Sequence, residues 1–312
     1  MKNQTEITHF ILKGLTDEEE LQNIMFSLFL ITYLATVLGN GTIVGVVVAE
    51  THLHTPMYFF LSNLSCLNIL YSTVILPKML SGFLRAHQRI SFAGCITQLH
   101  FFHFLGSSEA ILLAVMAYDR YIAICYPLRY PVIMRRQKCI LLAATTWATG
   151  FFHALMHAVM TSKLHFCGPN FIQHFFCDIK PVLNLACIGT RLNISLLNIV
   201  TGLIVIIPFL LTVLSYLYII SFLLLKVKSN NKRWKAFSTC SSHLTVVGLK
   251  YVPALFNYLP SSSEGSPKRD MIATLMHSAV TSVLNPLIYT LRNQDMKSAI
   301  RKSLDRFISV KI

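Results

Sequence analysis

Two charged residues lie in apolar surroundings, where charge is costly. Glu109 and Lys250 each interrupt a long stretch of otherwise uncharged and mostly apolar residues. A buried carboxylate or ammonium is expensive unless it is neutralised or paired with an opposite charge. We therefore hypothesise that Lys250 contacts Glu109. The residues leave two other surroundings open for Lys250: a water-filled cavity, and the lipid headgroup region, which a long side chain reaches by snorkelling.

Histidine pairs offer metal-binding chemistry in similar stretches. His100 and His103 are spaced i, i+3, and His153 and His157 are spaced i, i+4, so each pair lies on one face of a helix. Imidazole is a good ligand for copper and zinc. We favour the alternative in which these histidines are hydrogen-bonded polar residues inside a helical bundle, and we predict no metal site.

Membrane-spanning helices are the elements that must position these side chains. Of the 312 residues, 54% are apolar and only 13% are charged, which is too little charge to cover the surface of a soluble protein of this length. About 20 mostly apolar residues cross ~30 Å of hydrocarbon, and seven stretches reach that length. They are Ile24–Val48, Thr55–Pro77, Phe92–Tyr118, Cys139–Thr161, Leu196–Leu225, Ala236–Pro260 and Met271–Leu291. The sequence predicts an all-α membrane protein, a seven-transmembrane-helix bundle.

Basic residues set the predicted orientation. Lys and Arg cluster within 129–138, within 226–235 and after Arg292, and an excess of these residues marks the cytoplasmic side. Residues 1–23 are then extracellular, with a glycosylation sequon at Asn3. Residues 24–291 form the transmembrane domain, and 292–312 form a cytoplasmic tail with an amphipathic helix at the inner leaflet. The net charge of +14 is scattered in short clusters, which argues against nucleic-acid binding.

Two motifs lie at the predicted inner ends of the third and seventh stretches. They are MAYDRYIAIC at 116–125 and NPLIY at 285–289. Together, each in its own stretch, they resemble rhodopsin-like G-protein-coupled receptors. Further runs resemble, in order, the signatures of tetrapod-type odorant receptors: LHTPMYFFLS at 53–62, PKML at 77–80, PLRY at 127–130 and KAFSTCSSHL at 235–244. The resemblance covers nearly the whole chain.

The resemblance implies a plasma-membrane receptor that binds a small volatile odorant and activates a heterotrimeric stimulatory olfactory G protein to raise cyclic AMP. We expect Asp119 to pair with Arg120 in the resting state, and activation to free Arg120 toward the G protein. Pro286 loosens the seventh helix, so that Tyr289 can swing toward Tyr216. The full set of implied switch residues is Asp119, Arg120, Tyr121, Tyr216, Asn285, Pro286 and Tyr289.

Four cysteines fall on the predicted outer side, where disulfides form, and by themselves they permit three pairings. The resemblance implies a Cys95–Cys177 bridge from the third helix to the second outer loop, and a Cys167–Cys187 bridge within that loop. A bridged Cys177 has no thiolate to offer, which argues against a metal site in the surrounding HFFCD run at 174–178.

The predicted ligand pocket lies in the outer half of the bundle. The third helix presents Phe102, His103, Gly106 and Ser107 on one face by its 3.6-residue period. The resemblance adds the residues that face them: Ile204, Tyr251, Leu255, Tyr258 and Ser278. Such a pocket is mostly apolar with a few hydroxyls and one imidazole, which suits a small molecule held mainly by dispersion.

The chain departs from the family pattern in its predicted core polar site, which comprises Asn68, Glu109 and Lys250. Asn68 stands where related receptors usually carry Asp, and Lys250 stands where odorant receptors usually carry Phe. These departures leave sodium binding and the competence of the signalling switch open.

Other functions fit the sequence less well. A rhodopsin-like receptor with a non-olfactory chemosensory role has the same fold and stays open. A transporter or channel usually shows repeats or ion-lining charges in several spans, whereas here only Glu109 and Lys250 lie deep. We do not expect an enzyme or a cofactor, because the chain has no His-Glu-x-x-His motif and no paired intramembrane aspartates.

Overall fold

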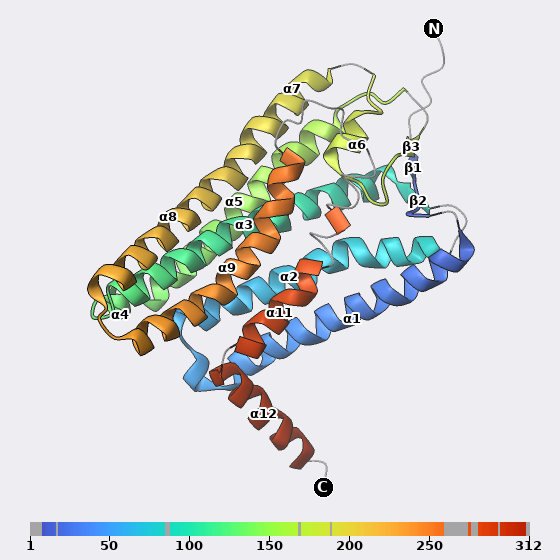
Figure 1. The fold of residues 1–312 in the computed structure, drawn as a ribbon. Coiled ribbons are helices and arrows are strands. Elements are labelled where there is room, and N and C mark those ends of the chain that lie inside the picture. The colour runs from blue at the N-terminus through green and yellow to red at the C-terminus, as the bar shows by residue number, and fades with distance from the viewer. Residues whose placement is uncertain are drawn as a thin grey trace.

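Long helices packed side by side make up most of the structure (Figure 1). The computed structural model describes residues 8–16, 18–84, 88–167, 170–187, 189–258, 274–275, 280–292 and 294–309. The helices are α1 (Glu19–Ala49), α2 (Pro56–Phe83), α3 (Phe92–Cys125), α4 (Tyr130–Ile133), α5 (Arg136–Ser162), α6 (Ile179–Leu183), α7 (Thr190–Leu196), α8 (Gly202–Lys226), α9 (Asn230–Tyr258), α11 (Thr281–Arg292) and α12 (Gln294–Ser309). A 3-10 turn, Thr51–Leu53, follows α1, and a π-helical turn, Leu197–Thr201, joins α7 to α8.

Five helical segments of the described chain are long and apolar enough to cross a membrane: α1, α2, α3, α5 and the continuous run Thr190–Lys226. The predicted sixth stretch lies in α9 as far as Tyr258, and its last two residues lie outside the described residues. Serines, His243 and Lys250 lower the hydropathy of α9. The predicted seventh stretch is covered in its second half by α11, and most of its first half lies outside the described residues. Helix α2 extends beyond the predicted second stretch, through Pro77 to Phe83. Helices inside membranes tolerate proline since neighbouring groups satisfy the freed carbonyl.

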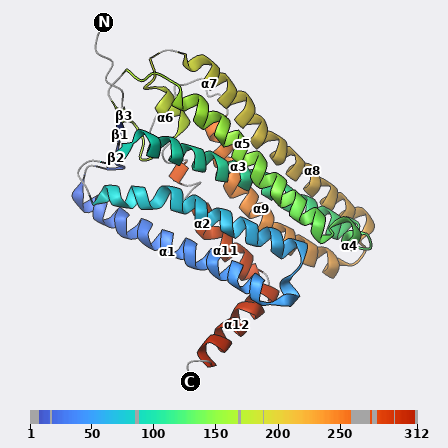
Figure 2. The same cartoon turned by 180° about the vertical axis from the view of Figure 1, so that it is seen from behind.

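A small β-sheet at the amino-terminal end corrects the all-α prediction. Strand β1 (His9–Leu12) pairs with β2 (Gln88–Ser91) in antiparallel fashion and with β3 (Phe171–Ile172) in parallel fashion. Phe10 and Leu12 point into a buried cluster, while His9 faces out, as expected from the two-residue period of a strand. The three strands come from segments far apart in the sequence, so only their assembly satisfies these backbone groups. The sheet and α12 lie at opposite ends of the bundle (Figure 2).

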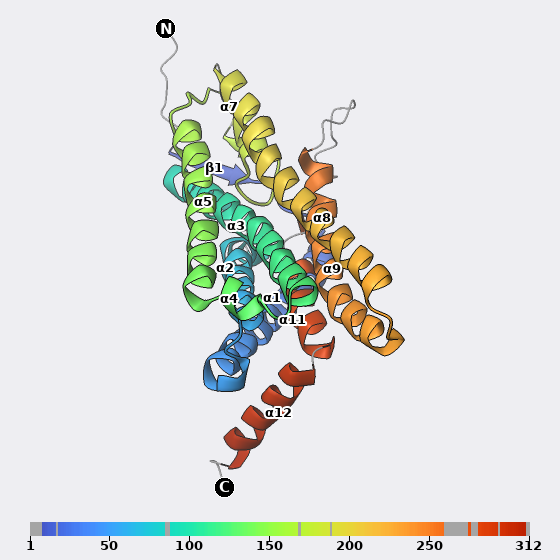
Figure 3. The same cartoon turned by 90° about the vertical axis from the view of Figure 1, so that its left-hand side faces the viewer.

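Helix α3 is the centre of the bundle and packs against α2, α5, α8 and α9 (Figure 3). Its closest neighbour is α5, at Gly150. A Cβ atom added there would lie 2.2 Å from Ser108 Oγ and 2.8 Å from the carbonyl oxygen of Phe104. Glycine is therefore needed at this position for the two backbones to approach, and the approach holds α3 and α5 in a fixed register.

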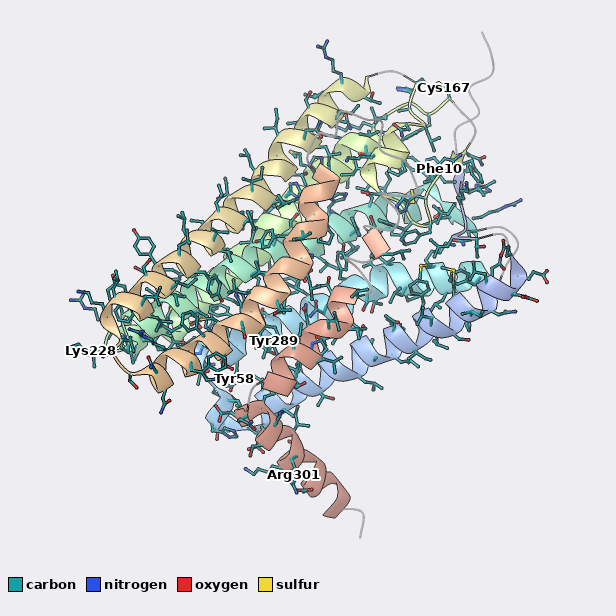
Figure 4. All side chains as sticks on the ribbon, in the orientation of Figure 1. Phe10, Tyr58, Cys167, Lys228, Tyr289 and Arg301 are labelled. Carbon is teal, nitrogen blue, oxygen red and sulfur yellow. A yellow bond between two sulfur atoms is a disulfide. The ribbon has the colours of Figure 1, made fainter. Side chains whose placement is uncertain are left out.

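Helix α12 docks onto the opposite end of the bundle. Met296 and Ala299 are fully buried, and Lys302 Nζ donates a hydrogen bond to Glu50 Oε2 at 2.9 Å. Arg301 is exposed on the outer side of the helix (Figure 4). The burial of one apolar face agrees with the predicted amphipathic helix.

Candidate functional site

A cavity of about 80 Å³ lies between α2, α3, α8, α9 and the loop that contains α6. Its walls are mainly apolar, with hydroxyl, imidazole and charged groups among them. The described residues that line it are Tyr71, Phe102, His103, Gly106, Ser107, Ala110, His174, Asp178, Lys180, Pro181, Leu197, Thr201, Val205, Lys250, Tyr251, Ala254 and Thr274. A concave, mostly apolar site with a few convergent polar groups is typical of small-molecule binding.

An ion pair joins α9 to α3 at the inner end of this cavity. Lys250 Nζ donates a hydrogen bond to Glu109 Oε2, and the two residues are only 2% and 3% exposed. The ammonium also lies 5.1 Å from the centre of the Tyr71 ring, a cation–π distance. The next residue on α9, Tyr251, donates its hydroxyl to the carbonyl oxygen of Ala110 at 2.7 Å. Two adjacent residues of α9 therefore bond to two adjacent residues of α3, and the contact hypothesised for Lys250 and Glu109 is present.

Histidines of α5 form a buried hydrogen-bond chain with hydroxyls of α3 and the π-helical turn. Ser107 Oγ lies 3.0 Å from His153 Nδ1, His153 Nε2 lies 3.0 Å from Thr201 Oγ1, and Thr201 Oγ1 lies 3.2 Å from His157 Nε2. Donors and acceptors alternate in either direction along this chain with both imidazoles neutral. For His153 and His157 this is the hydrogen-bonded arrangement that we favoured from the sequence, whereas His100 Nδ1 is buried with no hydrogen-bond partner among the described residues. Within the described ranges, no group of three or more His, Cys, Asp or Glu side chains could hold a metal ion.

The outer wall of the cavity is fixed by two disulfides and one charged contact. Cys95 is bridged to Cys177, and Cys167 to Cys187, as the resemblance implies. The first bridge places Asp178 beside α3, where its Oδ1 lies 3.1 Å from His103 Nε2. Burial raises the pKa of this carboxyl, but the hydrogen bond and charge of His103, the charge of His174 and the backbone N–H of Ile179 together outweigh burial and hold the pKa below its ordinary value of 3.8. Asp178 is therefore ionised at neutral pH.

At the far end of α3 the structure corrects the expected resting pair. Asp119 Oδ1 accepts a 2.8 Å hydrogen bond from the Tyr130 hydroxyl of α4, and among the described residues Asp119 and Arg120 form no salt bridge. Adjacent residues on a helix point about 100° apart, so neighbouring side chains do not face each other. Burial and the Asp119 charge raise the pKa of Tyr130, which keeps the hydroxyl protonated as the donor.

The other predicted switch residues surround this end of the bundle. The Tyr216 hydroxyl lies 2.7 Å from His243 Nδ1 of α9, so α8 is joined to α9. Tyr121 donates to the hydroxyl of Tyr126 at 3.4 Å. The Tyr289 side chain is buried on α11, on the side toward the bundle (Figure 4). The Tyr216 hydroxyl is therefore bonded to His243, whereas the buried Tyr289 hydroxyl has no hydrogen-bond partner among the described residues.

Comparison with known proteins identifies the family. The family model described as olfactory receptor matches residues 29–306. Human olfactory receptor 12D1 is 56% identical over 308 residues, which cover 99% of this chain and 96% of the relative. Human olfactory receptor 12D2 is 55% identical over 306 residues, which cover 98% of this chain and the whole of the relative. The chain belongs to the olfactory receptor family. It is therefore an odorant-sensing G-protein-coupled receptor and a multi-pass plasma-membrane protein, in a family of signalling receptors.

The ligand pocket predicted for this olfactory receptor coincides in part with the cavity. Phe102, His103, Gly106, Ser107 and Tyr251 line it. Ile204 and Leu255 are not among its described lining residues, and Val205 and Ala254 line it in their place. The side chain of Tyr258, together with Ser278 and the sequon at Asn3, lies outside the described residues.

Helix α8 presents Val205 to the cavity instead of Ile204, which the resemblance implied. Thr201, in the π-helical turn, and Val205 lie one turn apart and line the cavity, while Ile204 is half-buried and is not among its described lining residues. No proline or other local signal marks the π-helical turn at Leu197–Thr201, so the turn could not be found from the sequence.

The predicted core polar site divides into two groups. Asn68 Nδ2 donates to Asn40 Oδ1 at 3.1 Å, and Asn285 Nδ2 donates to Asn68 Oδ1 at 3.2 Å, so α1, α2 and α11 share one amide network. Among the described residues no hydrogen bond joins this network to the Lys250–Glu109 pair. Asn40 was not predicted as a member, although an asparagine in an apolar stretch is a signal that could have found it.

Proposed function

We propose that this receptor binds a small volatile organic molecule in the cavity between α3, α8 and α9. The observation that carries the proposal is the cavity itself, which has apolar walls and convergent polar groups. Phe102 and Tyr251 supply aromatic surface for dispersion contacts, and the outer wall is fixed to α3 by the Cys95–Cys177 bridge. A small molecule there touches α3, α8 and α9 at once, so its binding energy acts on their relative positions.

The membrane arrangement belongs to the same proposal. We propose seven crossings within 24–291, with α9 and α11 contributing to the sixth and seventh, residues 1–23 outside, and 292–312 in the cytoplasm. Basic residues of the α8–α9 connection and of α12 lie away from the β-sheet and the two disulfides. An excess of Lys and Arg favours the cytoplasmic side, and disulfides form on the outer side.

For the signalling step we propose a heterotrimeric stimulatory olfactory G protein and a rise in cyclic AMP. Arg120 forms no salt bridge in the described chain, while its neighbour Asp119 is held by Tyr130 of α4. Outward movement of α9 would require Tyr216 to release His243, which opens the inner end of the bundle to the G protein. Asn285, Pro286 and Tyr289 of α11 are positioned to follow α9, because the two helices pack together.

Cyclic AMP in transfected cells tests the function directly. A panel of volatile compounds is applied to cells that express the receptor with the stimulatory olfactory G protein. We expect a concentration-dependent rise in cyclic AMP for some members of the panel. No rise for any compound at verified surface expression contradicts the proposal, and a ligand-gated current without G protein supports a channel instead.

A matched pair of phenylalanines tests the location of the site. Phe102 is 8% exposed and lines the cavity, whereas its neighbour Phe101 is 40% exposed and does not. We expect Phe102→Ala to raise the half-maximal concentration about tenfold, which corresponds to ~1.4 kcal/mol, and Phe101→Ala to leave it near the native value. Equal effects of the two changes at equal surface expression contradict this site.

A further inference from the structure

A groove of about 700 Å³ lies at the end of the bundle opposite to the β-sheet (Figure 1). It runs between the end of α1, the connection from α1 to α2, the start of α2 and the start of α5. We call it the inner groove. Its volume is within the range of ~300–1,000 Å³ that is typical of sites for small molecules. It shares no described lining residue with the candidate ligand cavity, so it is a separate site.

The inner groove has a buried apolar floor and an exposed apolar rim. Leu53, Met134 and Cys139 line it and are at most 4% exposed, whereas Val48 and Ile140 at the rim are 70% and 49% exposed. Val48 belongs to α1 and Ile140 to α5, and both helices are long and apolar enough to cross a membrane. Exposed apolar side chains on such helices contact hydrocarbon. The rim of the groove therefore suits the acyl chain of a lipid.

The charge on the inner groove is positive. Arg136 is the only Lys, Arg, Asp or Glu among its described lining residues, and His54 adds a second positive charge when protonated. Arg136 is exposed and forms no salt bridge within the described chain. Helices α2 and α5 both begin at the groove, at Pro56 and Arg136, so the positive ends of two helix dipoles meet there. The groove therefore attracts an anion.

Acidic residues at this end of the bundle do not cancel that charge. Glu50 Oε2 accepts a hydrogen bond from Lys302 Nζ at 2.9 Å, and Asp119 Oδ1 accepts one from the Tyr130 hydroxyl at 2.8 Å. Neither acid lines the groove, and the two acids of α12, Asp295 and Asp305, do not line it either. The segment 129–138 beside the groove carries an excess of Lys and Arg. The field at the groove is thus positive beyond the contribution of Arg136 alone.

Two hydroxyls inside the groove are available to a ligand. The side chains of Thr55 and Ser62 line it and form no hydrogen bond among the described residues. The amide of Asn63 is already used, because Trp147 Nε1 donates to its Oδ1 at 3.1 Å and its Nδ2 donates to the carbonyl oxygen of Phe59 at 2.9 Å. Free hydroxyls can donate to ester or phosphate oxygens.

We infer that the inner groove binds an anionic phospholipid, with the phosphate beside Arg136 and an acyl chain along Val48, Phe59 and Ile140. This goes beyond odorant recognition, and it uses the proposed membrane arrangement only to assign the lipid to the cytoplasmic leaflet, where anionic phospholipids are concentrated. A phosphatidylcholine would bring a second cation toward Arg136, and a sterol has no phosphate to offer it.

Lipid binding to the purified full-length receptor tests the inference. The receptor in detergent is titrated with dioleoylphosphatidylserine or with dioleoylphosphatidylcholine, and bound lipid is counted by native mass spectrometry. In a second measurement, phosphatidylserine with a photoreactive group on its acyl chain is cross-linked to the receptor in phosphatidylcholine vesicles, and the labelled peptides are identified.

We expect phosphatidylserine to bind about tenfold more tightly than phosphatidylcholine, and the label to fall within 47–63 and 134–140. Arg136→Gln should weaken phosphatidylserine binding about tenfold. Arg135→Gln changes an exposed neighbour that does not line the groove and should leave the affinity near the native value.

A second matched pair tests the acyl-chain position. Ile140→Trp fills the apolar rim and should remove the label, whereas Leu141→Trp, at a neighbour that is 65% exposed and does not line the groove, should retain it. All four substitutions are at partly or fully exposed positions of the described chain, and thermal unfolding verifies that each variant is folded.

Equal affinities for the two lipids, equal effects of the two arginine substitutions, or a label outside both segments overturns the inference. Competition by glycerophosphoserine as strong as that by the intact lipid would show a site for a soluble anion, and labelling by photoreactive cholesterol alone would show a sterol site; each of these also overturns it. A cyclic AMP response to odorants that persists in these cases leaves the proposed function standing. Binding in detergent does not depend on which way the chain crosses the membrane.

Discussion

At the scale of single residues, the energetic cost of burying Lys250 depends on Glu109, and the cost of burying Glu109 depends on Lys250. Both side chains are almost fully buried, and their carboxylate and ammonium come from helices far apart in the sequence. Breaking a buried pair by removing one partner typically costs ~3–5 kcal/mol, because the remaining charge is left uncompensated. Removing both charges avoids that penalty.

A double-mutant cycle measures this dependence. We expect Lys250→Met and Glu109→Gln each to lower the thermal unfolding temperature of the purified receptor, and the double variant to unfold at a higher temperature than at least one of the single variants. Strict additivity of the two single effects would show that the residues do not interact. Surface expression gives an independent ranking of the same variants.

Asp178 provides a pH-dependent contribution whose sign follows from its lowered pKa. His103, His174 and the backbone N–H of Ile179 favour the ionised carboxylate. Because the folded pKa lies below the ordinary 3.8, the stabilisation is complete above that pH and is lost as the pH falls through the folded value. The Asp178→Asn variant has no ionisable carboxyl at this position, so its stability lacks this pH-dependent contribution. We expect the difference in unfolding temperature between the native receptor and Asp178→Asn to be constant from neutral pH down to about pH 5 and to shrink below pH ~3.8; a difference independent of pH over the whole range would contradict this account.

At the scale of elements, close approach of α3 and α5 decides how the cavity is shaped. Gly150 permits that approach, and three residues further along α5 His153 reaches Ser107 of α3. The contact between α3 and α5 therefore provides both the close helix packing and the link to the buried hydrogen-bond chain. A change that separates the two helices should disturb ligand recognition as well as stability.

Substitution of alanine for each of two glycines distinguishes the effect of helix packing on stability from the effect of helix propensity. Alanine at Gly45 of α1 meets nothing within 4 Å, so Gly45→Ala should be neutral or stabilising by up to ~1 kcal/mol. Alanine at Gly150 would clash with the backbone of Phe104, so we expect Gly150→Ala to destabilise the receptor by ~1–3 kcal/mol. Thermal unfolding of the two purified variants gives the comparison. Equal stability of both would mean that α3 and α5 have room to separate.

At the scale of the whole molecule, the two ends of the bundle differ in chemistry. Disulfides and the β-sheet lie at one end, and basic residues of α12 with the α8–α9 connection lie toward the other (Figures 1 and 4). Lys228, in that connection, lies far from Cys167 in the side-chain view (Figure 4). We propose that this polarity orients the chain in a membrane whose two sides differ in redox state and in surface charge.

Glycosylation tests the orientation. If the amino terminus is extracellular, Asn3 is glycosylated in mammalian cells, and treatment with a glycosidase that removes N-linked glycans lowers the apparent mass of the native receptor. The Asn3→Gln variant should migrate at the lower mass without treatment. Accessibility of an amino-terminal epitope in intact cells provides a second reading, and a cytoplasmic epitope would contradict the proposed orientation.

The sequence by itself determined the helical membrane class and much of the cavity wall. Length and low charge predicted seven spans, and five segments of the described chain are long and apolar enough to cross a membrane, because crossing hydrocarbon constrains each segment locally. Phe102, His103 and Ser107 were found because they share one face of a single regular helix. These properties depend on residues that are close together in the chain.

Only the tertiary structure decided how separate segments meet. Val205 lines the cavity in place of Ile204, the Tyr130 hydroxyl bonds to Asp119 where Arg120 was expected, and β1 pairs with two strands that are distant in the sequence. The sequence raised the Lys250–Glu109 contact only as one possibility, because their proximity depends on how α9 packs against α3. A local pattern fixes the face on which a side chain lies. Which side chain it contacts across that face depends on how the helices of the whole bundle pack together.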